Sequence, residues 1–426
     1  MYATKLSPVV VSLAFILSTW SLRIPVSGNF LLTTGRLAFL LCLFWSVILL
    51  SAASALVKRP PHEAQVGALG LIVVSMLALI SALYWQELTV AKIIVDPIVA
   101  AVMLLVVSAI AQPWDDRSAR IFTDCWLVFG AVSACSLGLW ILSKIGVSVA
   151  SMWEVRHFMY EAPGGLNRAL NGLLIANIPA LAVVTRAVTR GPVLRMIALA
   201  SCTAFLALTL CAGSRQTGAG ALLAIIVLHS VNHWLQVRRG WLTLLGSTYR
   251  IVFAMLLLGV LLWCVATVSE PVSDWLSTRW GVTTAEDLGT FSETPRAITY
   301  LAALSAVAEH PWVGLGPGNT ASMTGIWVDN GYLFLASEVG APALIVTVLV
   351  LLLALPRLLT RGRGSSLGGL SEMRVLALTT TLVFFGFMNI INDLLFEDFG
   401  WVALGLAAAA NKAISRRAAG GVPCGA

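Results

Sequence analysis

Residues 65–84 read QVGALGLIVVSMLALISALY, a stretch of twenty residues without a charged side chain. An α-helix rises about 1.5 Å per residue, so about 20 apolar residues cross a bilayer core that is about 30 Å thick. Backbone groups inside lipid must be hydrogen-bonded within their own segment, which makes a helix the expected form. The stretch therefore predicts a membrane-spanning helix.

Comparable stretches recur along most of the chain. The 426 residues are 58% hydrophobic and 11% charged, and the mean hydropathy is +0.90, whereas soluble domains carry charge on about a quarter of their residues. The expected fold is an all-α polytopic membrane protein with about twelve transmembrane helices and one long hydrophilic loop, 270–328, between the ninth and tenth. The predicted spans are 6–22, 36–57, 65–84, 90–112, 121–143, 165–185, 192–212, 217–235, 248–269, 329–354, 375–395 and 397–415.

Lysine and arginine residues fall in alternate loops, which is the pattern expected of cytoplasmic loops. They are Lys58 and Arg59; Arg117 and Arg120; Arg186, Arg190 and Arg195; Arg238, Arg239 and Arg250; and Arg357, Arg361, Arg363 and Arg374. Both termini are then predicted to face the cytoplasm. The net charge of +7 reports topology on this interpretation, and no nucleic-acid partner is inferred. The cysteines and histidines show no ligand spacing, so no metal site is predicted.

Two short polar segments between predicted spans carry an arginine on the outer side. CAGSRQTGAG, residues 211–220, places Arg215 among small residues, and GGLNRALNGLL, residues 164–174, places Arg168 at the mouth of a span. Either arginine extends to the lipid headgroups or binds a phosphate, which the guanidinium and nearby backbone N–H groups suit. The sequence leaves both interpretations open.

The long outer loop contains a predicted surface helix. TPRAITYLAALSAVAEH, residues 294–310, begins with a threonine cap and Pro295 and has apolar residues at helical spacing. Arg296 in its first turn is unfavourable for the helix dipole, so we expect an anionic partner, either Glu293 or a ligand phosphate. HPWVGLGPGNT, residues 310–320, follows and predicts a tight turn in which the backbone approaches its neighbours closely.

Two further segments combine acids and amides with apolar residues. IINDLLFEDFGW, residues 390–401, places Asp393 and Glu397 on one helical face. The sequence leaves four roles open for these two acids: they orient the arginines, they bind the hydroxyl of an acceptor, they hold a divalent ion, or they only cap helices. VDNGYLFLASEVG, residues 328–340, begins a predicted span with Asp329 and Asn330. Asp329 is either a helix cap or a reacting group, and it can be both.

These motifs together resemble the O-antigen ligase / Wzy polysaccharide polymerase superfamily. The similar region is 165–355, with the arginine link, the H-P-W-V-G-L-G-P-G-N turn and the N-G-Y-L-F-L-A-S-E-V-G segment in that order. The resemblance implies a GT-C-like glycosyltransferase of the bacterial inner membrane, with its active site facing the periplasm and no metal or cofactor. It also implies residues 1–164 as N-terminal transmembrane helices and 165–426 as the catalytic region.

The resemblance further implies ligands and roles. The donor and acceptor are undecaprenyl-diphosphate-linked glycans, membrane lipids surround the protein, and a chain-length regulator and a flippase are the expected protein partners. Asp329, Asn330, Arg215 and Arg296 are the expected catalytic residues, with both arginines on the diphosphate. The expected substrate-binding residues are Arg215, Arg296, Arg279, Arg168, Gly316, Gly318, Asn319, His310, Asp393 and Glu397.

One departure from the family pattern affects the expected activity. O-antigen ligases typically have His-Asn where this chain has Asp329-Asn330, and an acid there is more similar to exopolysaccharide polymerases. A polymerase joining repeat units into an exopolysaccharide or O-antigen is therefore the prediction, with a ligase that transfers a glycan to lipid A-core as the alternative. A polysaccharide transporter or flippase is a second alternative, for which ionisable residues at the bilayer midplane would be expected.

Overall fold

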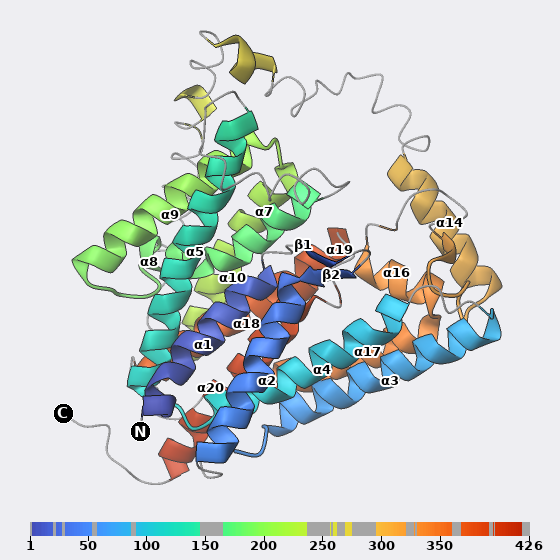
Figure 1. Cartoon of the computed structure of the whole chain (residues 1–426), viewed down its shortest axis with the longest axis horizontal. Coiled ribbons are helices and arrows are strands. Elements are labelled where there is room, and N and C mark those ends of the chain that lie inside the picture. Colours follow the sequence, from blue (N-terminus) through green and yellow to red (C-terminus); the bar gives the residue numbers. More distant parts are fainter. Residues whose placement is uncertain are drawn as a thin grey trace.

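A computed structural model gives the arrangement of the helices (Figure 1). It describes residues 2–19, 23–27, 30–52, 58–86, 91–144, 165–236, 256, 259–261, 269–274, 295–320, 328, 330–359, 368–391, 395 and 397–419.

Helices dominate the described part of the chain. The first half contains α1 (Tyr2–Thr19), α2 (Thr34–Ala52), α3 (His62–Tyr84), α4 (Ala91–Ala111), α5 (Asp116–Lys144), α7 (Gly165–Ala176), α8 (Ile178–Val184) and α9 (Pro192–Cys211). The second half contains α10 (Arg215–Gln236), α14 (Pro295–Glu309), α16 (Gly331–Glu338), α17 (Ala341–Leu358), α18 (Gly369–Val383), the π-helical segment η4 (Phe384–Met388), α19 (Asn389–Ile391) and α20 (Asp398–Ala419).

Within the described residues, seven helices are long and apolar enough to cross a bilayer. They are His62–Tyr84, Ile93–Ala111, Asp116–Leu142, Pro192–Cys211, Gln216–Leu235, Ala341–Leu358 and Gly369–Met388. On α3, Leu69 and Met76 are 63% and 59% exposed, which suits side chains that face lipid. The chain is therefore a helical, polytopic membrane protein. The predicted count of twelve spans remains a prediction, and the predicted span 248–269 lies mostly outside the described residues.

Two predicted spans are interrupted. The helix expected over 165–185 divides into α7 and α8 at Asn177, two residues before Pro179. The helix expected over 329–354 divides into α16 and α17 at Gly340, whose φ of 108° is outside the helical region. A β-hairpin, β1 (Arg23–Ser27) with β2 (Phe30–Thr33), also joins α1 to α2 and was not expected. Uniform hydrophobicity hid the two breaks, because it does not report backbone conformation.

The N-terminal and C-terminal helices pack into one body. α4 lies between α3 and α20, α18 packs against α5, α10 and α20, and α17 packs against α3. Buried aromatic side chains fill these contacts, including Phe15 against Trp126 and Phe385 against Trp401. The helices predicted as separate N-terminal and catalytic regions are thus in direct contact.

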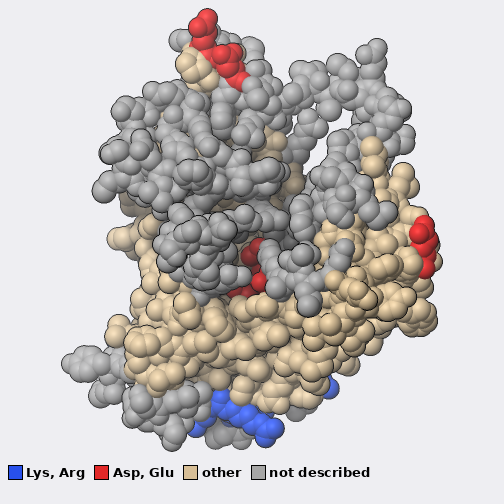
Figure 2. All heavy atoms as spheres, turned by 45° about the vertical axis from the view of Figure 1, so that its right-hand side comes forward, with Lys and Arg blue, Asp and Glu red and all other residues tan. Residues whose placement is uncertain are grey.

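The described lysine and arginine side chains gather at one end of this body, which we term the basic end. They lie after α2, α4 and α8, at the end of α17, in the first turns of α18 or near the end of α20. They are Lys58, Arg59, Arg117, Arg120, Arg186, Arg190, Arg195, Arg357, Arg374, Lys412, Arg416 and Arg417. Figure 2 shows basic side chains together at the lower edge of the molecule, and acidic side chains in a hollow above them, at the top and at the right edge. This one-sided charge is the feature that fixes orientation in polytopic proteins.

Candidate functional site

The predicted site residues divide into three groups. Asp329, Arg279 and Asp393 lie outside the described residues. The structure describes the backbones alone of Arg168 in α7, Arg215 at the start of α10 and Arg296 at the start of α14. The side chains or backbones of the others are fully described: Asn330, Gly316, Gly318, Asn319, His310 and Glu397.

Arg215 lies at the end of the body opposite the basic end. At the other end of α10, the indole Nε1 of Trp234 donates a 2.9 Å hydrogen bond to the carbonyl oxygen of Leu359, beside the basic end. A helix of 22 residues is about 33 Å long, so the two ends of α10 are separated by about the thickness of a bilayer. We term the end that contains Arg215 the far end.

The far ends of α7, α10 and the helix formed by α18, η4 and α19 converge. A Cβ atom placed on Gly220 of α10 would lie 2.7 Å from Leu174 of α7 and 3.1 Å from Phe387 of η4, so glycine permits this close approach. One helical turn nearer the far end are Asn171 on α7 and Gln216 on α10. The backbones of Arg168 and Arg215 lie in the same turns or the next. The structure thus brings these two predicted residues to one end of neighbouring helices.

Two amide side chains at this convergence have unused donors. The Nδ2 of Asn171 and the Nε2 of Gln216 are buried and have no hydrogen-bond partner among the residues that the structure describes. Asn171 is 2% exposed. An unpaired buried donor costs about 1 to 3 kcal/mol, so such groups usually have a ligand or a water as partner. An acceptor-rich ligand suits both donors.

Asn330 is the N-cap of α16 and also joins α16 to α19. Its Oδ1 accepts hydrogen bonds from the backbone N–H groups of Tyr332 at 3.1 Å and Leu333 at 2.9 Å. Its Nδ2 donates to the carbonyl oxygen of Ile390 at 2.9 Å. A helix cap was one of the two roles left open for Asp329. The N-cap of α16 is Asn330, because its backbone is extended and the helix begins at the next residue.

The π-helical segment η4 supplies a second contact to α16. The hydroxyl of Tyr332 donates to the carbonyl oxygen of Phe385 at 2.6 Å, and the Nδ2 of Asn389 donates to that of Phe384 at 3.0 Å. Burial raises the pKa of Tyr332 to about 12, so its hydroxyl keeps its proton at neutral pH. π-Helical turns are rare in proteins, and those that do occur are often found at functional sites. Neither η4 nor Tyr332 was predicted as part of the site.

The glycine turn of residues 310–320 docks on the end of α16. The backbone N–H groups of Leu315 and Gly316 donate to the carbonyl oxygens of Ser337 at 2.8 Å and Glu338 at 3.1 Å. Gly314 has a φ of +62°, and a Cβ atom there would lie 2.5 Å from the Glu338 backbone. Glycine is required at that position, because both the backbone conformation and the close approach exclude a larger residue.

The carboxylate of Glu338 is hydrogen-bonded to the backbone amides of this turn. It accepts hydrogen bonds from the backbone N–H groups of Gly318, of Asn319 at 3.1 Å and of Thr320 at 3.1 Å. Glu338 is 0% exposed, and burial raises its pKa to about 6 although the hydrogen bonds act in the opposite direction. Gly318 and Asn319 therefore do not offer these amides to a substrate, contrary to the way that a phosphate-binding turn works. In the sequence, the only sign of this pairing was the acid Glu338 at the end of the apolar segment that precedes Val339 and Gly340.

Helix α3 supports the turn from the side. The hydroxyl of Ser81 donates to the carbonyl oxygen of Val313 at 2.5 Å, and the indole Nε1 of Trp85 donates to that of Gly314 at 3.1 Å. Trp85 also contacts the ring of His310 edge to face, with a centroid distance of 5.1 Å. His310 is thus placed at the turn, as the sequence predicted, while Ser81 and Trp85 come from a region in which no site residue was expected.

The acidic segment after α19 is partly described. Glu397 is half-buried before α20, and the next residue, Asp398, is 9% exposed and lies within electrostatic range of Glu397 and Asp96. Among the described residues, no group of three or more histidine, cysteine or acidic side chains could hold a metal ion.

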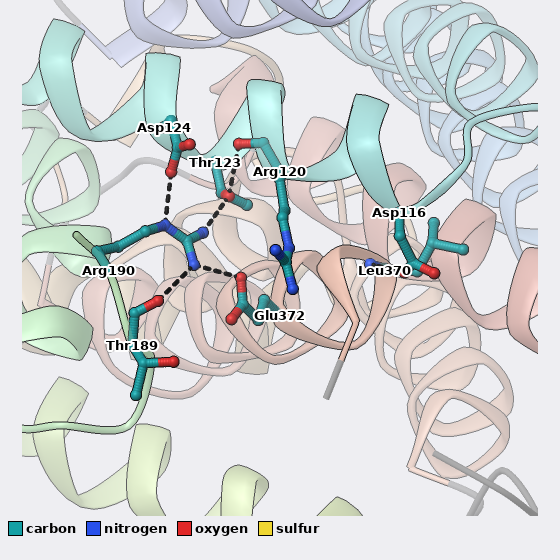
Figure 3. A network of polar contacts seen from close by, with 8 residues as sticks. All are labelled: Asp116, Arg120, Thr123, Asp124, Thr189, Arg190, Leu370 and Glu372. Atoms are coloured by element: carbon teal, nitrogen blue, oxygen red, sulfur yellow. Dashed lines mark hydrogen bonds and ion pairs between the residues drawn. The ribbon is translucent and has the colours of Figure 1, made fainter. Parts of the chain in front are cut away.

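The basic end contains a separate polar network (Figure 3). The guanidinium of Arg190 donates to Asp124 and Glu372 at 2.5 Å each and to the hydroxyl of Thr123 at 2.6 Å. It joins the loop after α8 to α5 and α18. All described contacts of Arg190 are with other residues of the basic end. The network therefore joins helices of the fold and lies apart from the residues at the far end.

Comparison with known proteins adds no assignment. No family model matches this chain, and no curated protein matches it. The resemblance to the ligase and polymerase superfamily therefore depends on the motifs quoted from the sequence.

Proposed function

We propose that this protein is a polymerase that joins lipid-diphosphate-linked oligosaccharide repeat units at the non-cytoplasmic face of the bacterial inner membrane. The observation that carries the proposal is the convergence of the α7 and α10 starts, with Arg168 and Arg215, beside α19 and the Asn330 cap. Asp329 directly precedes that cap in the sequence. The backbones of Arg168 and Arg215 and the buried amides of Asn171 and Gln216 support the proposal, because they lie at one end of the bundle.

The reaction transfers a glycosyl group between two lipid-linked units. The acceptor hydroxyl oxygen forms a bond to the anomeric carbon of the donor, and the bond from that carbon to the diphosphate oxygen breaks. Asp329 takes the hydroxyl proton, and the lipid diphosphate leaves with the bonding electron pair. A positioned general base typically contributes about 10²- to 10⁴-fold to such a step.

Arg215 and Arg296 stabilise the leaving diphosphate in this mechanism. Guanidinium groups remain charged and form paired hydrogen bonds to phosphate oxygens, each worth about 1.5 to 3 kcal/mol. These terms act where charge develops as the bond breaks, so they lower the barrier. No metal ion and no cofactor enters the proposed reaction, and a GT-C-like arrangement is part of the same proposal.

The unpaired amides support a carbohydrate substrate. Sugar hydroxyl and phosphate oxygens accept hydrogen bonds. Asn171 lies about one helical turn after Arg168 on α7, and Gln216 directly follows Arg215 at the start of α10. Partners in this proposal are the lipid-linked donor and acceptor, surrounding membrane lipids, and the chain-length regulator and flippase that the sequence resemblance implies.

The decisive experiment is analysis of lipid-linked glycans in a strain that lacks the protein. A polymerase predicts accumulation of single repeat units on the lipid diphosphate at the outer face. Loss of glycan from lipid A-core with intact free polymer would instead indicate a ligase. Retention of single units at the cytoplasmic face would indicate a flippase.

A further inference from the structure

We propose that Glu338 is a positioning residue for the glycosyl transfer: its carboxylate fixes the turn of residues 310–320 to α16, which holds the Asn330 cap in place. This inference rests on the proposed function for its effect on catalysis. The hydrogen bonds between Glu338 and the turn are present whatever the substrate is.

The turn of residues 310–320 has the composition of an anion-binding loop, and the anion that it binds is a side chain of the protein itself, Glu338 of α16. Three consecutive backbone N–H groups, from Gly318 to Thr320, converge on the two oxygens of one buried side chain. Consecutive amides of this kind bind phosphates in other folds. Here the carboxylate of Glu338 takes the position of the phosphate, so the turn is held without a ligand.

Helix α16 transmits this attachment to the far end. It has 8 residues and is therefore about 12 Å long, with Asn330 before its first residue and Glu338 as its last. A displacement of the Glu338 end moves the whole short helix, because a single α-helix of this length bends little. The hydrogen bonds of Asn330 to Ile390 and of Tyr332 to Phe385 would be lost with it.

Additional contacts hold the same unit from α3 and α17. The Ser81 hydroxyl lies 3.1 Å from the carbonyl oxygen of Glu338, and the N–H group of Ala341 donates to that of Pro311 at 2.8 Å. A Cβ atom on Gly340 would lie 2.5 Å from the carbonyl oxygen of Trp312. The turn, the α16 end and the α17 start therefore form one close-packed unit, in which Glu338 supplies the charge.

The described geometry suits an ionised carboxylate. Both of its oxygens face N–H donors, so a proton on either oxygen would weaken its hydrogen bonds to these donors. The surrounding elements carry several titratable or charged residues: His62, Glu63 and Tyr84 on α3, Arg296, Tyr300 and Glu309 on α14, His310 in the turn, Tyr332 on α16 and Arg357 on α17. None of them contributes an electrostatic shift to the pKa of Glu338, which burial raises to about 6. Activity should therefore fall as the pH decreases through this value.

The test compares Glu338→Gln and Glu338→Ala in the full-length protein in nanodiscs. Glu309→Gln is the matched control, since Glu309 is exposed on the neighbouring helix and forms a described contact only with Ser305. Hydrogen–deuterium exchange at pH 7.5 is followed in peptides that cover 311–320. We expect exchange to be faster by about tenfold or more in both Glu338 variants, which equals the loss of about 1.4 kcal/mol of protection, and unchanged in the control.

A second readout measures glycosyl transfer from lipid-linked repeat units as a function of pH. We expect wild type and Glu309→Gln to lose activity below about pH 6, and Glu338→Gln to have a reduced kcat without this acid limb. Two results would overturn the inference: hydrogen exchange that is unchanged in both Glu338 variants, or a loss of activity below about pH 6 that is the same in Glu338→Gln as in the wild type. If the wild type joins no units, the proposed function fails, and the exchange measurement still decides whether Glu338 fixes the turn.

Discussion

The hydroxyl of Tyr332 donates a 2.6 Å hydrogen bond to the carbonyl oxygen of Phe385, which lies in a π-helical segment. The two residues are on different elements, α16 and η4, and their contact fixes one against the other. A π-helical turn shifts the backbone pairing from i+4 to i+5, and here side-chain donors add to that pairing. Tyr332 is one of these donors, and Asn389 is another.

Replacement of Tyr332 by phenylalanine should destabilise the protein by about 1 to 3 kcal/mol, because a buried carbonyl group loses its donor. Thermal unfolding in detergent micelles would measure this change. The matched variant is Tyr84→Phe, which removes the same hydroxyl from a side chain that is 65% exposed and should leave the unfolding midpoint unchanged. Equal effects of the two substitutions would contradict a specific role for the Tyr332 contact.

The pair of Arg190 and Glu372 should be strongly coupled. Their side chains are 8% and 9% exposed, and removal of one partner leaves the other charge buried, which typically costs about 3 to 5 kcal/mol. Arg190→Ala and Glu372→Ala should each show this loss by denaturant unfolding, and the double variant should lose less than the sum. Arg417→Ala breaks a pair with Asp116 that is 46% and 40% exposed, and should cost about 0 to 1 kcal/mol.

Arginine substitutions test the proposed diphosphate contacts. Arg215→Ala and Arg296→Ala should each reduce polymer formation by about 10²-fold or more at normal protein levels, since each removes a cation that stabilises the leaving group. Arg195→Ala provides the control, because Arg195 is an exposed arginine at the basic end. Retention of full polymer yield by both variants would exclude the proposed role of the arginines.

The carboxyl of Glu338 should make stability depend on pH. Burial raises its pKa from 4.5 to about 6 in the folded protein, so the folded state binds more protons than the unfolded state between these values. The stability from this group is then fully present below about pH 4.5 and decreases by about 2 kcal/mol as the pH rises to about 7. The difference in unfolding free energy between wild type and Glu338→Gln, measured from pH 4.5 to 7, should change by this amount. A constant difference would show that Glu338 does not titrate in this range.

Activity and stability should thus respond to Glu338 in opposite directions. Acidification protonates the carboxyl, which removes an electrostatic burial penalty and at the same time removes acceptors from the turn. A protein that becomes less active at acid pH without a matching loss of stability from this group would fit both expectations.

The sequence predicted the helical membrane class because hydrophobicity within about 20 residues is sufficient to identify a span. It also predicted a surface helix after Thr294, which α14 confirms over Pro295–Glu309. The alternation of basic loops predicted that these charges share one side, and the described lysines and arginines do lie at one end. Each of these properties depends on residues that are close together in the chain.

The predicted substrate contacts of the glycine turn remain predictions. Gly316, Gly318 and Asn319 were expected to bind substrate, whereas the N–H groups of these residues donate within the protein, mainly to Glu338. Asn330 was expected to orient reacting groups, and its described contacts make it a helix cap. Glycine spacing shows that a backbone comes close to something, but it does not identify the neighbour.

The sequence by itself determined that this chain is a helical membrane protein and on which loops its positive charges lie, because transfer into lipid depends on local composition. Only the tertiary structure decided that Glu338 pairs with Gly318 to Thr320, that Arg190 pairs with Glu372, and that α7 and α10 meet at Gly220. Arg190 and Glu372 are 182 residues apart, and no pattern within a short window contains both. Such pairings depend on the packing of whole helices, which the order of residues specifies only through the complete fold.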